Sequence, residues 1–327
     1  MVRCCSEILI EVSMTASKKV LVSGGAGFIG SHLVDRLVEE GHQVVIADNL
    51  STGKLRNINP AATFHHTDIT QQSIREVFHR EQPEIVFHMA AQTSVVESTK
   101  DSLKDCQINA NGTLRLLEAC KIYGIDQFIY SSTGGALYGN PKVTPCPETT
   151  PITPMSPYGV SKYVGEQYIE LFNRLNHLNY TILRYGNVYG PRQDPHGESG
   201  VIAIFSQLML DGKNPRIFGD GLQERDFIYV SDIVDANLKA ISSSSDTAFN
   251  IGTGNATNLH LVYEGLKTII GFSGQPEYHP ARPGEVFSIS LECDKAARTL
   301  GWTPSIELQE GLEKTVEFFK RRIGRTG

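Results

Sequence analysis

The chain of 327 residues has only six cysteines, a single tryptophan and no long apolar stretch. A membrane-spanning helix needs about 20 consecutive apolar residues, and the sequence contains no such run. No two cysteines have Cys-x-x-Cys spacing, so zinc-binding and thioredoxin-type chemistry have no support. The formal net charge is −6, which is not the basic excess typical of nucleic-acid-binding proteins. We therefore expect no metal, no membrane and no nucleic acid partner.

The first 18 residues contain one short apolar run, Ile8 to Ile10, between Glu7 and Glu11. This run is too short and too acidic for a secretory signal peptide. Since a first buried strand is expected near Lys19, we predict a disordered leader over residues 1–18. Without a secretory signal the cysteines are expected to stay reduced, which predicts a cytoplasmic protein.

Strand-like and helix-like patterns alternate through the first half of the chain. Short apolar runs predict buried strands, and apolar residues at helical spacing predict helices packed on a sheet. This alternation predicts an α/β fold with a Rossmann-like, doubly wound parallel sheet. The predicted strands lie at 20–22, 43–48, around Phe64, at 85–88 and at 128–130, and the predicted helices lie at 31–40 and 105–123.

The second half has shorter elements. Six prolines between Pro141 and Pro157 predict an extended surface loop, followed by a long helix to about His177 and a strand at 181–184. From Gly186 onward the connections become richer in glycine and proline. We therefore predict a NAD-binding Rossmann domain over 19–185 and a smaller α/β substrate lobe over 186–327, with the chain crossing between them.

A glycine cluster from Gly24 to Gly30 separates the first predicted strand from the first helix. Glycines there allow a tight turn and let backbone N–H groups approach a pyrophosphate at the positive end of the helix. Asp48 ends the second strand, 18 residues beyond Gly30, where a carboxylate would accept hydrogen bonds from ribose hydroxyls. Because this carboxylate would repel a 2′-phosphate, the sequence favours NAD over NADP.

A tyrosine and a lysine share one face of the long helix. Tyr158 and Lys162 have i, i+4 spacing, with Ser156 as the predicted N-cap and Pro157 at the first helical position. The helix dipole and the Lys162 ammonium are both expected to lower the pKa of Tyr158. The pair therefore predicts a tyrosinate general base.

Hydroxyl side chains end the strand that precedes this helix. Ser132 and Thr133 lie at the carboxyl edge of the predicted sheet, where open α/β sheets bind ligands. Either hydroxyl could hydrogen-bond a substrate and the phenol of Tyr158. The alternative interpretation is an ordinary turn rich in serine and threonine.

Together, these motifs resemble the extended short-chain dehydrogenase/reductase family, and within it the nucleotide-sugar 4-epimerases of the UDP-glucose/UDP-galactose type. The resemblance runs from about Lys19 to the C-terminus. Its segments in chain order are 24–30, 48–50, 68–69, 88–92, 109–113, 132–133, 156–162, 184–192, 225–232, 282–285 and 300–302.

The resemblance implies a role for each matching residue. Catalysis would fall to Tyr158 and Lys162, with Thr133 favoured over Ser132 as the hydroxyl. NAD would be held by Gly24, Gly27, Phe28, Ile29, Gly30, Asp48, Asn49, Asp68, Ile69, Ala90, Ala91, Gln92, Asn109, Tyr158, Lys162, Tyr185 and Val188. The UDP-sugar would be held by Thr133, Tyr158, Asn187, Val201, Phe218, Arg225, Arg282 and Glu285. For Arg225 the alternative is a salt bridge to Asp226 or Asp232.

The implied reaction interconverts UDP-glucose and UDP-galactose, or their N-acetyl forms, through a 4-keto sugar with tightly bound NAD. The related 4,6-dehydratases have Asp-Glu after the threonine and the UDP-glucuronate decarboxylases have Glu, whereas this chain has Gly134 and Gly135. A 4-keto-sugar reductase would use NADPH, which Asp48 disfavours. UDP-glucuronate 4-epimerisation stays open, and a non-catalytic NAD-sensing scaffold is opposed by the presence of Tyr158 and Lys162. The family also implies a homodimer formed through the helices at 105–123 and 157–177.

Overall fold

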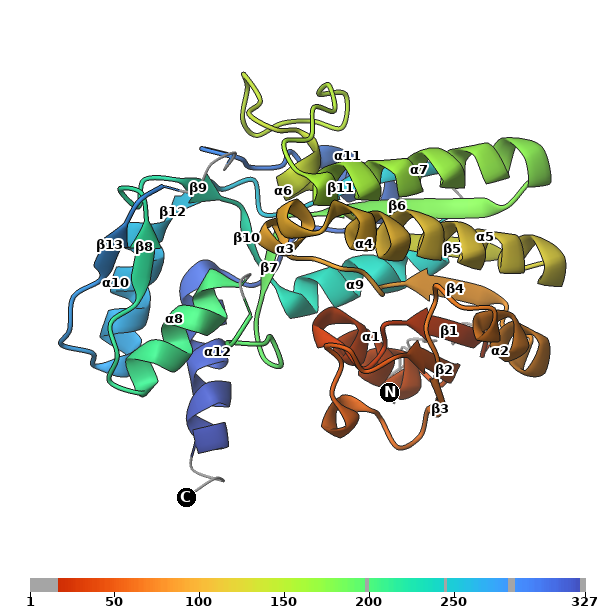
Figure 1. Cartoon of the computed structure of the whole chain (residues 1–327), viewed down its shortest axis with the longest axis horizontal. Coiled ribbons are helices and arrows are strands. Elements are labelled where there is room, and N and C mark those ends of the chain that lie inside the picture. The colour runs from red at the N-terminus through yellow and green to blue at the C-terminus, as the bar shows by residue number, and fades with distance from the viewer. Residues whose placement is uncertain (1–16, 198–199, 244–245, 282–285, 324–327) are drawn as a thin grey trace, which may run out of the picture.

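The computed structural model describes residues 17–197, 200–243, 246–281 and 286–323 (Figure 1). Most of the predicted leader therefore lies outside the described residues. The main element is a seven-stranded sheet in the order β11-β6-β5-β4-β1-β2-β3, with every neighbouring pair parallel. Its strands are β1 (Lys19–Ser23), β2 (Gln43–Asp48), β3 (Thr63–His66), β4 (Ile85–His88), β5 (Gln127–Thr133), β6 (Asn179–Tyr185) and β11 (Thr247–Ile251). The predicted doubly wound parallel sheet is confirmed.

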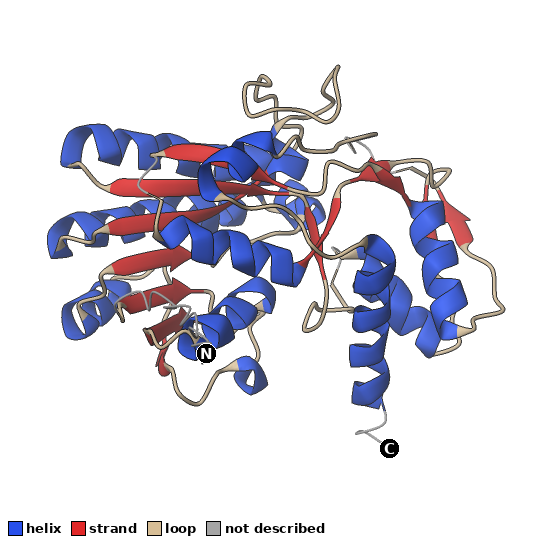
Figure 2. Cartoon of the chain, turned by 180° about the vertical axis from the view of Figure 1, so that it is seen from behind, coloured by secondary structure: helices blue, strands red, loops and turns tan. Residues whose placement is uncertain are grey.

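Helices cover both faces of this sheet (Figure 2). Their apolar sides form two separate cores, one on each face. On one face lie α1 (Phe28–Glu39), α9 (Val230–Ile241) and α11 (Asp294–Leu300). On the other lie α2 (Ser73–Glu81), α5 (Gly112–Tyr123) and α7 (Pro157–Asn176). None of the helices in the described ranges is both long and apolar enough to cross a membrane.

Most of the elements beyond residue 186 form a smaller lobe beside the carboxyl edge of the sheet (Figure 1). Their apolar side chains make a core of their own, in which Phe205, Tyr263 and Val316 are buried. The lobe contains β7 (Asn187–Tyr189), α8 (Val201–Leu210), β8 (Arg216–Phe218), β9 (Glu224–Arg225), β10 (Phe227–Tyr229), β12 (Thr257–Asn258), α10 (Leu259–Ile270), β13 (Glu277–His279) and α12 (Leu308–Ile323).

The chain passes repeatedly between the two lobes. After β7 it forms α8, β8, β9 and β10, then returns to the large sheet with α9 and β11, and β11 pairs with β6 over five residues. After α10 and β13 it returns again with α11. The edge strand of the large sheet and two of its covering helices thus come from beyond residue 186.

The predicted helix at 105–123 differs in detail. It begins earlier, as α4 (Ser102–Cys106), because the Asp101 carboxylate accepts a hydrogen bond from the Lys104 amide (2.9 Å) and caps it. A π-helical turn, η2 (Gln107–Asn111), then joins α4 to α5. Apolar spacing does not reveal such a turn, yet π-helical turns are frequent at functional sites.

The long helix α7 agrees with its prediction. Ser156 caps it by accepting a hydrogen bond from the Gly159 amide (3.2 Å), and Pro157 is its first residue. Before it, the proline-rich segment forms an extended loop that leaves the body of the molecule after α6 (Gly134–Leu137) (Figure 1). This places Tyr158 in the first turn of α7, beside the end of β5.

Candidate active site

The turn between β1 and α1 is a close-packed backbone cradle. Gly24 has a φ of 73°, and a Cβ on it would lie 2.6 Å from the amide nitrogen of Ala90. A Cβ on Gly30 would collide with the carbonyl oxygen of Gly24. Gly27 precedes α1 and provides no side-chain cap, so the first N–H groups of the helix are left to an anion or to water. The cradle therefore fits a pyrophosphate.

Acidic and amide side chains follow the neighbouring strands. Asp48 is nearly buried, and its carboxylate accepts hydrogen bonds from the amides of Ala26 (3.0 Å) and Leu50 (2.7 Å). These two bonds fix the carboxylate next to the cradle and leave acceptor capacity for ribose hydroxyls. Asn49 donates to Asp68 (2.8 Å), which joins the segments after β2 and β3. Ile69 is buried in the core beneath them. This set fits the adenosine end of NAD.

The segment after β4 is fixed by Asn109. The Gln92 amide donates to the Asn109 side chain and the Asn109 side chain donates to the Gln92 carbonyl, both at 2.9 Å. Asn109 itself is buried in η2. It therefore holds Gln92, which directly follows Ala90 and Ala91, in place by hydrogen bonds within the protein.

A cleft of about 1410 Å³ lies at the carboxyl edge of the sheet, between the two lobes. It exceeds the roughly 300–1,000 Å³ of a typical single-ligand pocket. The cleft can therefore hold a nucleotide sugar beside the reactive end of a dinucleotide. The predicted site residues that line it are Phe28, Ile29, Ser132, Thr133, Tyr158, Tyr185, Asn187, Val188, Val201, Phe218 and Arg225.

Arg225 and Asn187 line the cleft from two strands of the smaller lobe, β9 and β7. The Asn187 amide donates to the Asp226 carbonyl (2.6 Å), and β7 pairs with β10. Arg225 donates to the carbonyls of Glu224 (2.8 Å) and Phe287 (3.4 Å). The sequence suggested Asp226 as a salt-bridge partner of Arg225. Its carboxylate instead accepts hydrogen bonds from Thr253, Gly254 and Leu291. The suggested substrate ligands Arg282 and Glu285 lie outside the described residues.

Tyr158 lines the cleft together with Thr133. Burial raises the pKa of Tyr158 to about 12, against the effect of the nearby Thr133 side chain, and the charge of Asp105 adds to the rise. The predicted lowering of this pKa is therefore wrong for the chain by itself, because desolvation of the phenolate prevails. A tyrosinate near neutral pH therefore requires positive charge beside the phenol.

Lys162 is buried one turn further along α7, with its ammonium 4.1 Å from the centre of the Tyr130 ring. Burial lowers the pKa of Lys162 to about 7, although the charges of Glu166 and Asp105 act in the opposite direction. Small changes in the charge around Lys162 therefore decide whether it is a cation at neutral pH.

Ser132 and Thr133 have different surroundings. The Ser132 hydroxyl donates to the buried Glu166 (2.5 Å), whereas the Thr133 side chain lies near Tyr158 in the cleft and acts on its pKa. Glu166 also receives two bonds from the Arg184 guanidinium, at 2.6 and 3.0 Å. Burial disfavours the Arg184 cation, but its bonds to Glu166 outweigh this and raise the pKa of Arg184. This geometry favours Thr133 as the substrate-facing hydroxyl.

Sequence reasoning missed the Glu166–Arg184 pair and the buried Asp105. One signal was available for Glu166, which follows Lys162 by four residues and so lies on the same face of α7. For Asp105 the signal was weaker: it precedes Asn109 by four residues. Neither spacing identifies the residue on another element that the side chain contacts.

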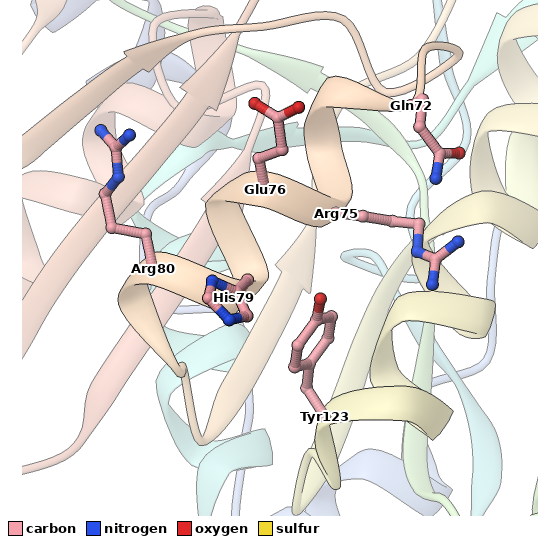
Figure 3. A pocket seen from close by; sticks show the side chains of 6 residues that line it. All are labelled: Gln72, Arg75, Glu76, His79, Arg80 and Tyr123. Carbon is pink, nitrogen blue, oxygen red and sulfur yellow. The ribbon is translucent and has the colours of Figure 1, made fainter.

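A second, smaller depression lies on the outer surface of α2 and α5 (Figure 3). Tyr123 of α5 points its hydroxyl toward α2, and most of the surrounding side chains are exposed. The lining residues are Gln72, Arg75, Glu76, His79, Arg80 and Tyr123, none of which belongs to the predicted site. The large cleft is therefore the candidate active site.

Comparison with known proteins agrees with this geometry. Residues 20–252 match the family described as NAD dependent epimerase/dehydratase. The UDP-glucose 4-epimerase of Mycolicibacterium smegmatis is 41% identical over 310 residues, which cover 93% of this chain and 99% of that protein. The crystal structure of a Thermotoga maritima UDP-glucose 4-epimerase with UDP-glucose is 49% identical, covers 93% of this chain and 99% of its own, and superposes with a TM-score of 0.92.

A Thermus thermophilus UDP-glucose 4-epimerase in complex with NAD is 39% identical, covers 92% of this chain and 99% of its own, and has a TM-score of 0.88. The similarity thus extends over both lobes, and it includes relatives solved with each of the two ligands that the cleft can hold. The chain belongs to the NAD dependent epimerase/dehydratase family.

Proposed function

We propose that this chain is a UDP-sugar 4-epimerase that interconverts UDP-glucose and UDP-galactose with tightly bound NAD. The observation that carries the proposal is the position of Tyr158. It lines, with Thr133, one cleft that also contains the start of α1 and Arg225. A cofactor held by the first lobe and a diphosphate held by the second would therefore meet at a proton acceptor.

NAD would rest on the cradle from Gly24 to Gly30, with Asp48 at its adenosine ribose and Lys162 at its nicotinamide ribose. When bound, NAD supplies a hydride acceptor for C4 of the sugar and a positive charge near Tyr158. That charge favours the phenolate, which burial alone opposes.

In the proposed reaction Tyr158 takes the proton from the sugar 4-hydroxyl, and Thr133 holds that hydroxyl in line. The 4-keto sugar then turns its other face toward the cofactor, and Tyr158 returns the proton to the 4-oxygen. Lys162 as a cation stabilises the phenolate. Arg225 and Asn187 hold the diphosphate through both half-reactions, with Val201 and Phe218 beside the nucleotide.

The two glycines after Thr133 separate this function from related chemistries. A Cβ on Gly134 would lie 2.6 Å from the Leu291 side chain, and one on Gly135 would lie 3.1 Å from the Asn187 amide oxygen. The acids that a dehydratase or decarboxylase needs after the threonine are thus absent, and the packing leaves little space for them. Proton abstraction at C5 and loss of carbon dioxide therefore lack their acid–base groups.

A panel of UDP-sugars tests the function. The purified chain, supplied with NAD, should convert UDP-galactose to UDP-glucose without net NADH production, because the hydride returns to the same carbon. Chromatography of UDP-galactose, UDP-N-acetylgalactosamine and UDP-glucuronate reactions gives the preferred sugar. Conversion of UDP-glucuronate alone, or no 4-epimer from any sugar, would refute the proposal.

Gly30→Ala should produce a folded protein that loses bound NAD. Its new Cβ would meet the Gly24 carbonyl, so the cradle must open. We expect NAD content to fall at least tenfold, a change of about 1.4 kcal/mol or more in binding. Cofactor released on denaturation gives the measurement.

Gly41→Ala at the other end of α1 is the control. Its Cβ would meet no atom within 4 Å, although its φ of 85° makes the variant about 1 kcal/mol less stable. Equal NAD content in Gly30→Ala and the wild type would contradict the assignment of the cradle.

We infer that two copies pair through α4, α5 and α7. Apolar side chains on these helices are exposed, namely Leu103 (83%), Ile122 (49%), Val160 (49%) and Leu175 (69%). Sedimentation velocity should therefore give a mass near twice 36.0 kDa, and a monomer at micromolar concentration would refute the pairing.

We also place the protein in the cytoplasm, where its described cysteines, all free thiols, would stay reduced.

A further inference from the structure

Asp105 is a buried carboxylate that the proposed reaction does not use. It lies in α4 with 1% of its surface exposed. One carboxylate oxygen accepts from the Ser161 hydroxyl (2.5 Å), and the other accepts from the Gln92 side chain (2.8 Å) and the Asn109 side chain (3.1 Å). These three donors belong to α7, to the segment after β4 and to η2. Asp105 therefore ties together the three elements that surround the predicted nicotinamide position.

All three donors are neutral, and a buried carboxylate is costly unless a positive charge balances it. Lys162, which follows Ser161 in α7, is the buried lysine on whose ionisation Asp105 acts. Glu166 acts on Lys162 more strongly than Asp105, and it also accepts two hydrogen bonds from the Arg184 guanidinium. The charge of Asp105 adds to that of Glu166 in favouring the Lys162 cation.

The remaining groups that face Lys162 do not titrate near neutral pH. From β5, Tyr130 lies under the ammonium, and burial raises its pKa well above the ordinary value. From β4, burial lowers the pKa of His88 well below its ordinary value, and the Lys162 charge adds to this. On α7 itself, burial raises the pKa of Tyr158 to about 12.

We propose that Asp105 is a positioning residue for the epimerase reaction: its charge keeps Lys162 cationic, and its hydrogen bonds hold Ser161, Gln92 and Asn109 around the reacting end of the cofactor. The proposal rests on the proposed catalytic role of Lys162. Although α4 carries none of the predicted catalytic groups, its residue Asp105 would then set the pH range in which the enzyme is active.

The test compares Asp105→Asn with Ser161→Ala in NAD-saturated enzyme, using the pH dependence of kcat for UDP-galactose. Both variants disturb the Ser161–Asp105 bond, but only Asp105→Asn removes the charge. Without that charge Lys162 loses its proton at lower pH. The alkaline limb of the curve of kcat against pH therefore moves to lower pH. Tyr158 also ionises more readily, since the Asp105 charge raises its pKa, so the acidic limb moves in the same direction.

We expect both limbs of Asp105→Asn to move by about one pH unit, with kcat near pH 9 falling about tenfold. Ser161→Ala should keep both limbs in place. Unmoved limbs in Asp105→Asn, or equal shifts in the two variants, would overturn the proposal. Asp105→Ser provides a second uncharged variant if Asp105→Asn does not fold. An inactive wild type would instead refute the proposed function, which separates the two failures.

Discussion

Tyr158→Phe should lower kcat for UDP-galactose by about 10²–10⁴-fold, the range that a positioned general base contributes. The substitution removes only the phenol oxygen of a side chain that lines the cleft. The ring remains to fill its place, so KM and bound NAD should change little. Steady-state kinetics at saturating substrate, with NAD content measured on the same samples, gives the result.

Tyr163→Phe is the matched control. Tyr163 lies on the same helix, five residues further along, and is not among the residues that line the cleft. Its variant should keep wild-type kcat. If Tyr158→Phe retained more than one tenth of wild-type kcat with normal NAD content, another group would have to be the base.

Glu166→Gln should destabilise the protein by about 3–5 kcal/mol, the cost of breaking a buried ion pair. The side chains of Glu166 and Arg184 are 0% and 7% exposed, and their closest atoms are 2.6 Å apart. The amide would leave the Arg184 guanidinium buried without a counter-charge and would also disturb the bond from Ser132. Urea unfolding of the NAD-loaded protein measures the change.

Glu170→Gln, one turn further along α7, removes a matched surface pair. Glu170 and Arg174 are 3.9 Å apart, with side chains 36% and 63% exposed, so this variant should cost about 0.5 kcal/mol or less. Equal losses from the two variants would show that the buried pair contributes no more than the exposed one. The double variant Glu166→Leu, Arg184→Met should recover much of the stability, because it removes both charges together.

Local patterns were sufficient to predict the architecture of the first lobe. Short apolar strands alternate with amphipathic helices. The glycines from Gly24 to Gly30, placed between a strand and a helix, indicate a turn that binds a pyrophosphate. The cap of α7 and the position of Tyr158 in its first turn followed from Ser156 and Pro157. Each of these features depends on neighbours within a few residues.

Features that depend on distant residues could not be read from the sequence. The pKa of Tyr158 is set by burial, which only the assembled cleft defines. The different surroundings of Ser132 and Thr133 depend on Glu166, 34 residues away from the first of them. The contact between Asp105 and Ser161 spans 56 residues, and the π-helical turn beside it leaves no mark in the apolar spacing.

The late return of the chain to the large sheet has a consequence for biosynthesis. Until α9 and β11 have left the ribosome, the core on the α1 side of the sheet lacks the side chains of α9, and β6 has an unpaired edge. Trp302, buried with its indole N–H donating to the Asp232 carbonyl (2.9 Å), closes the same core from near the C-terminus. The larger lobe is therefore completed only after most of the smaller lobe has been synthesised. Nascent chains shorter than about 300 residues should depend on chaperones and remain unable to retain NAD.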